Sequence, residues 1–331
     1  MATLEDIARE LQVSKSTVSK ALNGAKDVSK AMRQAVLEKA VEMGYSRIPR
    51  SARAPKLAVF ITDTMEYTRP EDFGYDIIVG FRKAAEPAGF QVELEELDRN
   101  LQLEMRYDEY MVLQGYSGAL FLGLDLNDPW LKEFESCRTP TVLYDNYVGC
   151  NPNVTRVSVD NWEGMELAVA YLRAQGHRKI GYLGSYQASY IYQQRHRAFL
   201  RAMENNGLAT EAEMTGIDYH ISDCLSKHLP RLLEGGCTAI ACSHDMLAHG
   251  VMLHCRELGL RIPEDISIVG FDDVPICRYT VPPLTTIRQN RTELGKSSFF
   301  ALSSQLNRVP LSTFLLHAEL IERESCAMVR G

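Results

Sequence analysis

The sequence predicts an α/β protein, in which a small all-α helix-turn-helix headpiece precedes a body of two doubly wound α/β subdomains. Residues 3–23 fit two short helices joined by a tight turn, and from Leu57 onward apolar strand-like segments alternate with amphipathic helices. The charge divides at the same place. Residues 1–56 contain 11 Lys and Arg against 6 Asp and Glu, whereas residues 57–331 contain 25 against 37. A basic head on an acidic body is typical of a chain in which one module meets nucleic acid.

The first helix of the headpiece is predicted from apolar residues at helical spacing, namely Leu4, Ile7, Ala8 and Leu11. Thr3 can cap its start, and Asp6 stands where a capping-box carboxylate belongs. Val13 interrupts the pattern, and Ser14 can then cap a second helix. The inward residues of that helix are Thr17, Val18, Ala21 and Leu22. The first helix would act as the brace and the second as the recognition helix.

The outer face of the second helix has short hydroxyls and lysines and lacks a carboxylate; its residues are Lys15, Ser16, Ser19 and Lys20. A solvated face normally mixes charges of both signs, whereas a face for phosphates and base edges should exclude acids. The alternative is a plain helical hairpin at the start of a globular protein. The composition of this face favours DNA binding.

A third helix is predicted over residues 28–43, capped by Ser29 and ended by Gly44, which tolerates the left-handed conformation. The segment that follows carries four positive charges and prolines at positions 49 and 55. It is expected to be a linker, either a spacer or a contact to the DNA backbone. The predicted division is a headpiece over residues 1–45, a short basic linker or hinge over 46–56, and a body over 57–331.

The body should form two parallel sheets with helices between the strands. Strands are expected at Leu57–Ile61, Gln91–Leu94, Gly118–Leu122, Thr141–Tyr144, Arg156–Val159, Lys179–Leu183, Ala239–Cys242 and Ser267–Phe271. Helices are expected near 75–88, 100–113, 163–175, 193–206, 222–234 and 245–258. The N-subdomain would comprise about 57–159 plus 289–313, and the C-subdomain about 160–288 plus 314–331. The chain is expected to cross between them near 159–161 and 285–287, and a cleft between them is the expected ligand site.

Acidic and polar groups collect after the predicted strands, at Asp145, at Ser243-His244-Asp245 and at Asp272-Asp273. Arg195 lies in a helix that follows a loop with Tyr186, Tyr190 and Tyr192. Carboxylates accept from hydroxyls, Arg donates in a planar fork, and aromatic faces can cover a sugar ring, so a polyol fits this set better than a polyanion.

Each of these residues also has a structural interpretation. Asp245 could be the N-cap of its helix, and Asp272 or Asp273 could cap a turn. Arg195 could pair with a surface carboxylate, and His244 could be a structural hydrogen-bonding group.

Catalysis is not expected, because the chain lacks the glycine-rich nucleotide loops and the Gly-x-Ser-x-Gly elbow of hydrolases. The eight cysteines are scattered without zinc-ligand spacing, so neither a metal nor another cofactor is predicted. Free cysteines indicate a reduced cytoplasm. No apolar run resembles a signal peptide or could span a bilayer, so no membrane partner is expected.

The sequence resembles the LacI/GalR family of transcriptional regulators along nearly its whole length. In the headpiece the matching residues are Thr3–Glu10, Val13-Ser14, Thr17-Val18-Ser19, Leu22-Asn23-Gly24, Val28-Ser29 and Gly44-Tyr45. In the body they are Val159-Asp160-Asn161, Gly176–Tyr182, Ser243-His244-Asp245, Ile262–Asp273 and Pro282–Arg288.

The resemblance implies a homodimer whose headpieces bind double-stranded palindromic operator DNA. It also implies a body similar to type I periplasmic sugar-binding proteins that closes over a small-molecule effector. By motif position the base-reading residues would be Lys15, Ser16 and Lys20, with Ser14, Thr17, Ser19 and Asn23 nearer the phosphates. The effector-binding residues would be Asp145, Arg195, His244, Asp245 and Asp272, with Phe73 and Tyr75 near an aromatic contact; Tyr190 joins them as a candidate from the tyrosine-rich loop.

The chain departs from the family pattern at three points. Gln12 stands in the turn where the family usually has Gly, and His244 stands where Asn is frequent. The linker is short and lacks the leucine that, in the family, wedges into the minor groove; Ala52-Arg53 is the nearest remnant. With the hinge shortened, the recognition helix should carry more of the DNA specificity. The chain also ends soon after its last strand, so a tetramerising helix is not expected.

The predicted function is a cytoplasmic, dimeric, ligand-responsive repressor of a carbohydrate-utilisation operon. A purine or nucleoside effector is a second hypothesis, since tyrosines also stack on bases. Two rival functions are a cytoplasmic sugar-binding protein without strong DNA regulation and a glycosidase-like enzyme.

Overall fold

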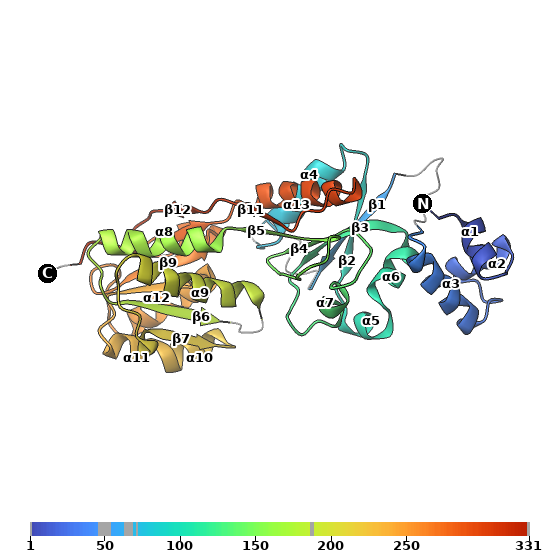
Figure 1. Cartoon of the computed structure of the whole chain (residues 1–331). Coiled ribbons are helices and arrows are strands. Elements are labelled where there is room, and N and C mark those ends of the chain that lie inside the picture. The colour runs from blue at the N-terminus through green and yellow to red at the C-terminus, as the bar shows by residue number, and fades with distance from the viewer. Residues whose placement is uncertain (1, 46–53, 63–68, 71, 186–188, 330–331) are drawn as a thin grey trace. The chain divides into compact units, whose positions relative to one another are not determined.

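The computed structural model describes residues 2–45, 54–62, 69–70, 72–185 and 189–329, and it divides into two compact units (Figure 1). Unit 1 comprises Met1–Val157 and Gly295–Phe314, and unit 2 comprises Ser158–Leu294 and Leu315–Gly331. Most of the predicted linker, residues 46–53, lies outside the described residues. Among the described residues, no helix is long and apolar enough to cross a membrane.

The headpiece consists of three helices, α1 (Leu4–Glu10), α2 (Lys15–Leu22) and α3 (Lys30–Glu42). Their starts are fixed by the predicted caps. Thr3 and Asp6 form a capping box, Ser14 accepts from the backbone of Thr17, and Ser29 accepts from that of Met32. The buried apolar residues form one small core, made of Ile7, Ala8, Val18, Ala21, Leu22, Val36, Leu37 and Ala40.

The turn between α1 and α2 is left-handed at Gln12, where the family usually has glycine. Gln12 has a φ of 53°, in the left-handed region that few non-glycine residues adopt. Gly44, which ends the headpiece after α3, has a φ of 62°. The sequence predicted the left-handed conformation at Gly44, whereas at position 12 it showed only a departure from the glycine that the resemblance implies. Gly24, with a φ of 70°, is a third left-handed residue of the headpiece.

Unit 1 is built on a six-stranded sheet with the order β11-β5-β4-β3-β1-β2. The strands are β1 (Lys56–Ile61), β2 (Gln91–Glu96), β3 (Tyr116–Leu122), β4 (Thr141–Tyr144), β5 (Val154–Val159) and β11 (Thr313–Leu316). The helices of this part are α4 (Tyr75–Ala85), α5 (Arg99–Glu104), α6 (Tyr107–Gln114), α7 (Pro129–Glu133) and α13 (Arg291–Leu306). The strands from β5 to β2 pair in parallel, as the alternation of strands and helices predicted.

Unit 2 is built on a second six-stranded sheet with the order β12-β10-β9-β8-β6-β7. The strands are β6 (Ile180–Ser185), β7 (Thr215–Asp218), β8 (Ala239–Cys242), β9 (Ser267–Asp272), β10 (Thr285–Arg288) and β12 (Glu319–Ile321). The helices with the largest buried faces are α8 (Asn161–Ala174), α9 (Tyr190–Asn205), α11 (Leu229–Glu234) and α12 (Asp245–Glu257). Ala239 and Ala241 of β8 pack with α8 and α9, whereas Ile240 and Cys242 pack with α11 and α12. The sheet is therefore covered on both faces, and the doubly wound fold is confirmed (Figure 1).

Several details differ from the sequence prediction. The helix expected over 100–113 is two helices, because Met105 is extended and ends α5. Residues 285–287, where the chain was expected to cross between the subdomains, belong to β10. The chain instead passes from unit 2 to unit 1 after Leu294. The strands β7, β11 and β12 and the helices α7 and α13 were not predicted. The three strands are short, with only three or four residues each, and so show little alternation.

Candidate DNA-reading helix and effector-binding residues

Helix α2 presents most of the predicted DNA-binding side chains to solvent. Lys15, Ser16 and Lys20 are exposed, as expected for base-reading residues, whereas Thr17 and Ser19 are half-buried. The hydroxyl oxygen of Ser14 accepts from the backbone nitrogen of Thr17 at 3.0 Å. It also lies 2.9 Å from the hydroxyl oxygen of Thr17. The first turn of the helix is thus fixed at the end from which recognition helices contact bases.

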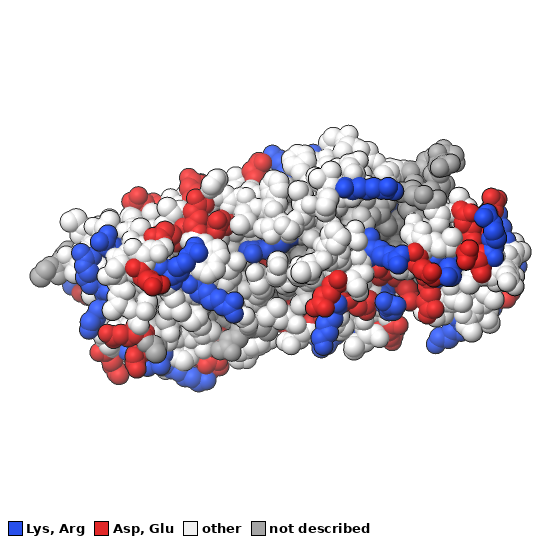
Figure 2. Space-filling view, viewed as in Figure 1, with Lys and Arg blue, Asp and Glu red and all other residues white. Residues whose placement is uncertain are grey.

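Acidic residues from neighbouring elements lie against both lysines of this face. Lys15 Nζ is 2.7 Å from Glu5 Oε1, and Lys20 Nζ is 2.5 Å from Asp27 Oδ2. Figure 2 shows acidic side chains beside basic ones over the headpiece. The helix itself lacks carboxylates, as the sequence indicated, but its lysines have intramolecular partners. Exposed pairs of this kind are weak and can exchange for phosphate or base contacts.

Asn23 closes the recognition helix. Its side-chain amide donates to the carbonyl oxygen of Ser19 at 2.7 Å and lies 3.3 Å from the hydroxyl of Ser19. Asn23 is exposed just beyond the last helical residue. The residue therefore fixes the end of the helix while remaining accessible from outside.

In unit 1 the effector candidates lie at the carboxyl end of β4 and the start of α4. Asp145 directly follows β4 and has a φ of 54°, so the chain turns sharply there. The rings of Phe73 and Tyr144 are 6.2 Å apart, and Tyr75 is the first residue of α4. Phe73 and Tyr75 are half-buried. The structure thus brings Phe73 close to the strand that Asp145 follows.

In unit 2 the candidate Arg195 is the centre of a buried polar network. The side chain is 1% exposed, so it does not pair with a surface carboxylate. Its Nε donates to Asn161 Oδ1 at 2.8 Å, and its Nη1 donates to the carbonyl of Ser243 at 2.6 Å. The same Nη1 lies 3.0 Å from Asp272 Oδ1, and the guanidinium lies 3.8 Å from the centre of the Phe271 ring. One charged side chain therefore joins α8, α9 and the ends of β8 and β9.

Asp272 is held in place by more than this ion pair. Its Oδ1 also accepts from the side-chain amide of Gln289 at 2.7 Å, and its backbone has a φ of 115°. Such a φ is strained in a residue with a Cβ, and strained residues cluster at functional sites. Sequence reasoning missed Gln289 and Asn161 as parts of this network. Asn161 lies two residues after the end of β5, close to the position that identified the aspartates.

His244 acts as the N-cap of α12, the structural interpretation raised for it. Its Nδ1 accepts from the backbone nitrogen of Leu247 at 3.2 Å, and its Nε2 lies 2.6 Å from Ser185 Oγ. Burial, together with the positive charge of Arg195, lowers the pKa of His244 to about 3, so the ring is neutral. Because Nδ1 accepts, the proton must be on Nε2, which donates to Ser185. The Ser185 hydroxyl proton is then free to point elsewhere.

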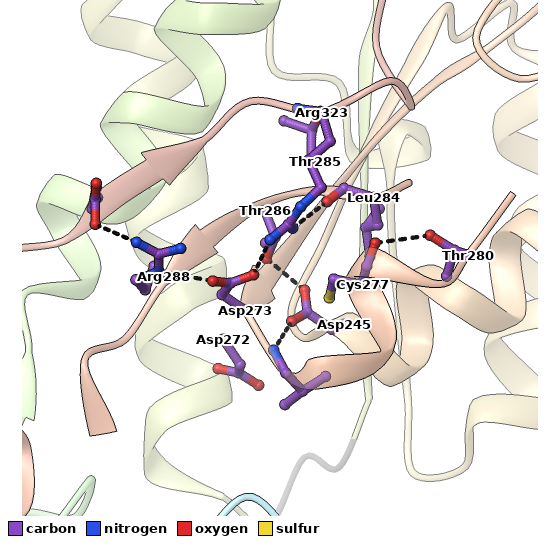
Figure 3. Close-up of polar contacts among 12 residues, drawn as sticks. Asp245, Asp272, Asp273, Cys277, Thr280, Leu284, Thr285, Thr286, Arg288 and Arg323 are labelled. Carbon is purple, nitrogen blue, oxygen red and sulfur yellow. Dashed lines mark hydrogen bonds and ion pairs between the residues drawn. The ribbon is translucent and has the colours of Figure 1, made fainter. Parts of the chain in front are cut away.

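Asp245 is not the N-cap of its helix but its first residue, and it is 1% exposed. Oδ1 accepts from the Thr286 hydroxyl at 2.5 Å, and Oδ2 accepts from the backbone nitrogen of Val274 at 2.9 Å (Figure 3). The carboxyl group of Asp245 therefore connects α12 to β10 and to the loop after β9. These contacts give Asp245 structural partners on β10 and on the loop after β9, and its assignment as an effector-binding residue stays a prediction.

The neighbouring Asp273 bonds to two arginine side chains of unit 2, as Figure 3 shows. Its Oδ1 accepts from Arg323 at 2.6 Å and its Oδ2 from Arg288 at 2.7 Å. These two guanidinium groups hold the pKa of the Asp273 carboxyl below its usual value, although burial acts against them. Asp272 and Asp273 thus separate into two roles, with only Asp272 joined to Arg195.

Asp245 predicts a pH dependence of stability. Burial, and then the negative charge of Asp272, raise the pKa of Asp245 above its ordinary value of 3.8. The folded protein therefore keeps this proton at pH values where the unfolded chain has lost it. The resulting stabilisation is complete below pH 3.8 and is lost as the pH rises through the higher folded-state pKa. An Asp245→Asn variant should show a flatter dependence of unfolding free energy on pH from about 4 to 7.

Urea unfolding at several pH values measures this effect. Glu264→Gln, which removes an exposed carboxyl from the same unit, is the matched control and should keep the wild-type slope. Identical slopes for Asp245→Asn and wild type would show that Asp245 is ionised in the folded protein throughout this range.

A cavity of about 250 Å³ lies beside this network, within unit 2. Ser185 and Gly184 of β6 line it, together with Tyr192 and His196 of α9. The Tyr192 ring also lies 5.3 Å from the ring of His244 and 5.6 Å from the Arg195 guanidinium. The candidate Tyr190 is half-buried at the start of the same helix. Hydroxyls, an imidazole and an aromatic face thus surround a space of small-molecule size.

These features together define a class of protein: a DNA-binding regulator whose helix-turn-helix headpiece precedes an effector-binding α/β body. Residues 3–47 match the model of bacterial regulatory proteins of the lacI family, and residues 169–326 match that of the periplasmic binding protein-like domain. The chain belongs to the LacI family of bacterial regulatory proteins, and it is a DNA-binding transcriptional regulator with an effector-binding body.

Curated relatives match over nearly the whole chain. The transcriptional regulator MalR of Streptomyces coelicolor is 30% identical over 348 residues, which cover 99% of this chain and 97% of MalR. The transcriptional repressor CytR of Escherichia coli is 29% identical over 331 residues, covering 98% and 96%. Both relatives are transcriptional regulators.

Among solved structures, a complex of the regulator CelR with cellobiose is 25% identical, with a TM-score of 0.73 and coverage of 98% of this chain and 100% of that one. The lac repressor dimer bound to operator and the anti-inducer ONPF is 23% identical, with a TM-score of 0.66 and coverage of 98% and 99%. The predicted fold is therefore confirmed at the level of the whole chain.

Proposed function

We propose that this protein is a repressor of a carbohydrate-utilisation operon, whose affinity for its operator is changed by a sugar or sugar derivative. The observation that carries the proposal is the buried pair of Arg195 and Asp272, which lie 3.0 Å apart at the strand ends of unit 2. A fixed donor and acceptor beside the Tyr192 ring suit the hydroxyls and the apolar face of a sugar. The cellobiose bound to the related CelR supports this class of effector.

We assign effector-binding residues in each unit separately. In unit 1 these are Asp145, Phe73 and Tyr75, and in unit 2 Arg195, Asp272 and Tyr190. His244 and Asp245 act through these residues, because their hydrogen bonds to Leu247, Val274 and Thr286 are structural. An effector that binds one conformation of the protein better than another would shift the operator affinity by linkage.

A purine or nucleoside effector is the second candidate; the transcriptional repressors CytR of Escherichia coli and PurR of Yersinia pestis are relatives at 29% identity. Aromatic rings such as those of Phe73 and Tyr192 can stack on bases as well as on sugars. A thermal-shift screen of sugars, sugar phosphates and nucleosides on the full chain separates the two. Stabilisation by nucleosides alone would replace the sugar proposal.

The operator side of the function rests on the headpiece, residues 1–45, with the linker 46–56 joining it to the body 57–331. We assign base reading to Lys15, Ser16 and Lys20, and phosphate contacts to Ser14, Thr17, Ser19 and Asn23. A palindromic operator is expected if two copies of the chain bind together. Gel retardation with palindromes upstream of the coding sequence tests this. A failure to retard any of them at low salt would instead favour a sugar-binding protein without DNA regulation.

Lys20→Ala should weaken operator binding by about 1–3 kcal/mol, because it removes an exposed cation from the reading face. The free protein holds this side chain only by its exposed contact to Asp27, so the cost of releasing it is small. Fluorescence anisotropy with labelled operator at fixed salt measures the change. Lys83→Ala, at an exposed position of α4, is the control for total charge. Equal operator affinities for Lys20→Ala and Lys83→Ala would exclude Lys20 from the interface.

The partner that we propose for the apolar surface of unit 2 is a second copy of the chain. Met246 and Leu253 of α12 are 50% and 47% exposed. In the same unit, Tyr279 and Val281 are 80% and 69% exposed. Exposed apolar residues in this number commonly mark interfaces. Leu253→Glu should therefore shift the protein from dimer to monomer in sedimentation velocity, whereas Leu103→Glu, at an exposed position of α5, should not. An unchanged dimer in the first variant would remove α12 from the interface.

A further inference from the structure

A second cavity, of about 290 Å³, lies in unit 1 at the edge of the sheet where the strands begin. Tyr116 and Ser117 at the start of β3, Pro140 before β4 and Asn153 before β5 contribute to its wall. Asp145 follows the opposite, carboxyl end of β4. The cavity is therefore separate from the effector candidates of this unit, and a ligand bound there would not occupy their site.

Two residues that line this cavity carry buried polar atoms without hydrogen-bond partners among the described residues. Gln305, near the end of α13, is 7% exposed, and in the described part of the chain neither its Nε2 nor its Oε1 has a hydrogen-bond partner. The hydroxyl of Ser117 is also buried and unpaired among these residues. Both residues line the cavity. Native proteins satisfy almost all buried polar groups, so three unpaired atoms around one space point to a missing ligand.

The headpiece supplies part of the wall. Val41, Gly44 and Tyr45, at the end of α3 and just beyond it, line the cavity together with residues of α6. Contacts of the same unit join the headpiece to the rest: Arg138 donates to the carbonyls of Val41 and Glu42, and Gln34 Nε2 donates to Glu109 Oε1 at 3.0 Å. A ligand in the cavity would therefore touch the DNA-binding module directly.

We propose that this cavity binds a small neutral molecule with an amide or nucleobase edge, and that its occupancy changes operator affinity. An amide side chain with both its donor and its acceptor unpaired is satisfied at once by a planar group that offers an adjacent acceptor and donor, as glutamine does with adenine. The rings of Tyr45 and Tyr116 and the apolar side chains of Met111 and Leu306 suit the faces of such a molecule. The volume limits the ligand to about the size of a single base.

A ligand at this site could change operator affinity although the linker lacks the leucine that, in the family, wedges into the minor groove. The segment from 46 to 56 contains no leucine that could act as a minor-groove wedge. A ligand that contacts α3 and the body together acts on the headpiece without that wedge. By linkage, operator and ligand must then alter each other's affinity by the same factor.

Calorimetric titration of the full chain with adenine, uracil and nicotinamide tests the proposal. We expect at least one probe to bind, and Gln305→Leu to weaken its binding at least tenfold, or about 1.4 kcal/mol. Gln114→Leu makes the same chemical change at the exposed end of α6 and should bind like wild type. Ser117→Ala, a smaller change, should weaken binding several-fold and serves if Gln305→Leu fails to fold. Binding of adenine or uracil would indicate a nucleobase ligand, whereas binding of nicotinamide alone would indicate an amide.

The outcomes separate this site from the effector site. Arg195→Met should lose the effector response but keep binding of the probe to the cavity. Absence of binding by all three probes, or equal binding by wild type and the cavity variants, would overturn the proposal. Binding that leaves the operator affinity of the wild type unchanged would overturn its regulatory half. A several-fold change in operator affinity that is absent in the cavity variants would support both halves.

Discussion

Replacing Arg195 by methionine should abolish the effector response and lower the free energy of unfolding of unit 2 by about 3–5 kcal/mol. Arg195 is 1% exposed, and its guanidinium bonds to Asn161, Ser243 and Asp272. Methionine fills much of the same volume but leaves the Asp272 carboxylate buried beside an apolar group. Removing one partner of a buried ion pair costs far more than the pair itself contributes.

Urea unfolding and operator titrations with and without effector measure both effects. Arg195→Lys keeps the charge but cannot reproduce the fork that spans Asn161 and Ser243, so it should regain part of the stability and little of the response. Arg256→Met, at an exposed position of α12, is the control and should be close to wild type. Wild-type stability and a normal effector response in Arg195→Met would show that this network is dispensable.

The local signals in the sequence were sufficient for the headpiece. The caps at Thr3, Ser14 and Ser29 and the left-handed position at Gly44 depend on neighbours within four residues. Such interactions are specified by the residues that make them. For the same reason, the strands with strong apolar runs were found, whereas the short edge strands β7, β11 and β12 were not. Edge strands are half-exposed and carry a weaker pattern.

The site was predictable in its members but not in their roles. Residues after strands were identified because parallel strands direct their carboxyl ends to one edge of the sheet. Which carboxylate is free for a ligand depends on partners far away in sequence. Asp245 is engaged by Val274 and Thr286, 29 and 41 residues later, and Asp273 by Arg288 and Arg323. Sequence spacing holds no information on such bonds, so the distinction required the folded sheet.

The ion pairs of the recognition helix show the same limit in the headpiece. The outer face of α2 has no acid of its own, yet Lys15 and Lys20 lie against Glu5 and Asp27 of neighbouring elements. A charge pattern read along one helix therefore gives the sign of that helix and not the potential of the whole surface. Binding to DNA should exchange these weak contacts for phosphates, with a dependence on salt.

Gly295→Ala should be the most destabilising single methyl addition in unit 1, with a cost of about 3 kcal/mol or more. A Cβ at Gly295, in α13, would collide with the carbonyl oxygen of Ile77 and lie 2.8 Å from the backbone nitrogen of Phe81. Both atoms belong to the backbone of α4, which cannot move aside as a flexible side chain can. The rings of Phe81 and Phe299, 5.9 Å apart, fix the spacing of the two helices from the same side.

Thermal and urea unfolding of the full chain would measure this cost. The matched control is Gly149→Ala, because a Cβ there meets its nearest neighbour, the Tyr147 hydroxyl, at an ordinary 3.5 Å. The control should unfold like wild type, whereas Gly295→Ala should unfold at a much lower urea concentration and lose operator binding with its fold. Equal stability of the two variants would mean that α13 and α4 can separate without loss. The close approach of these two helices would then not be needed to hold unit 1 together.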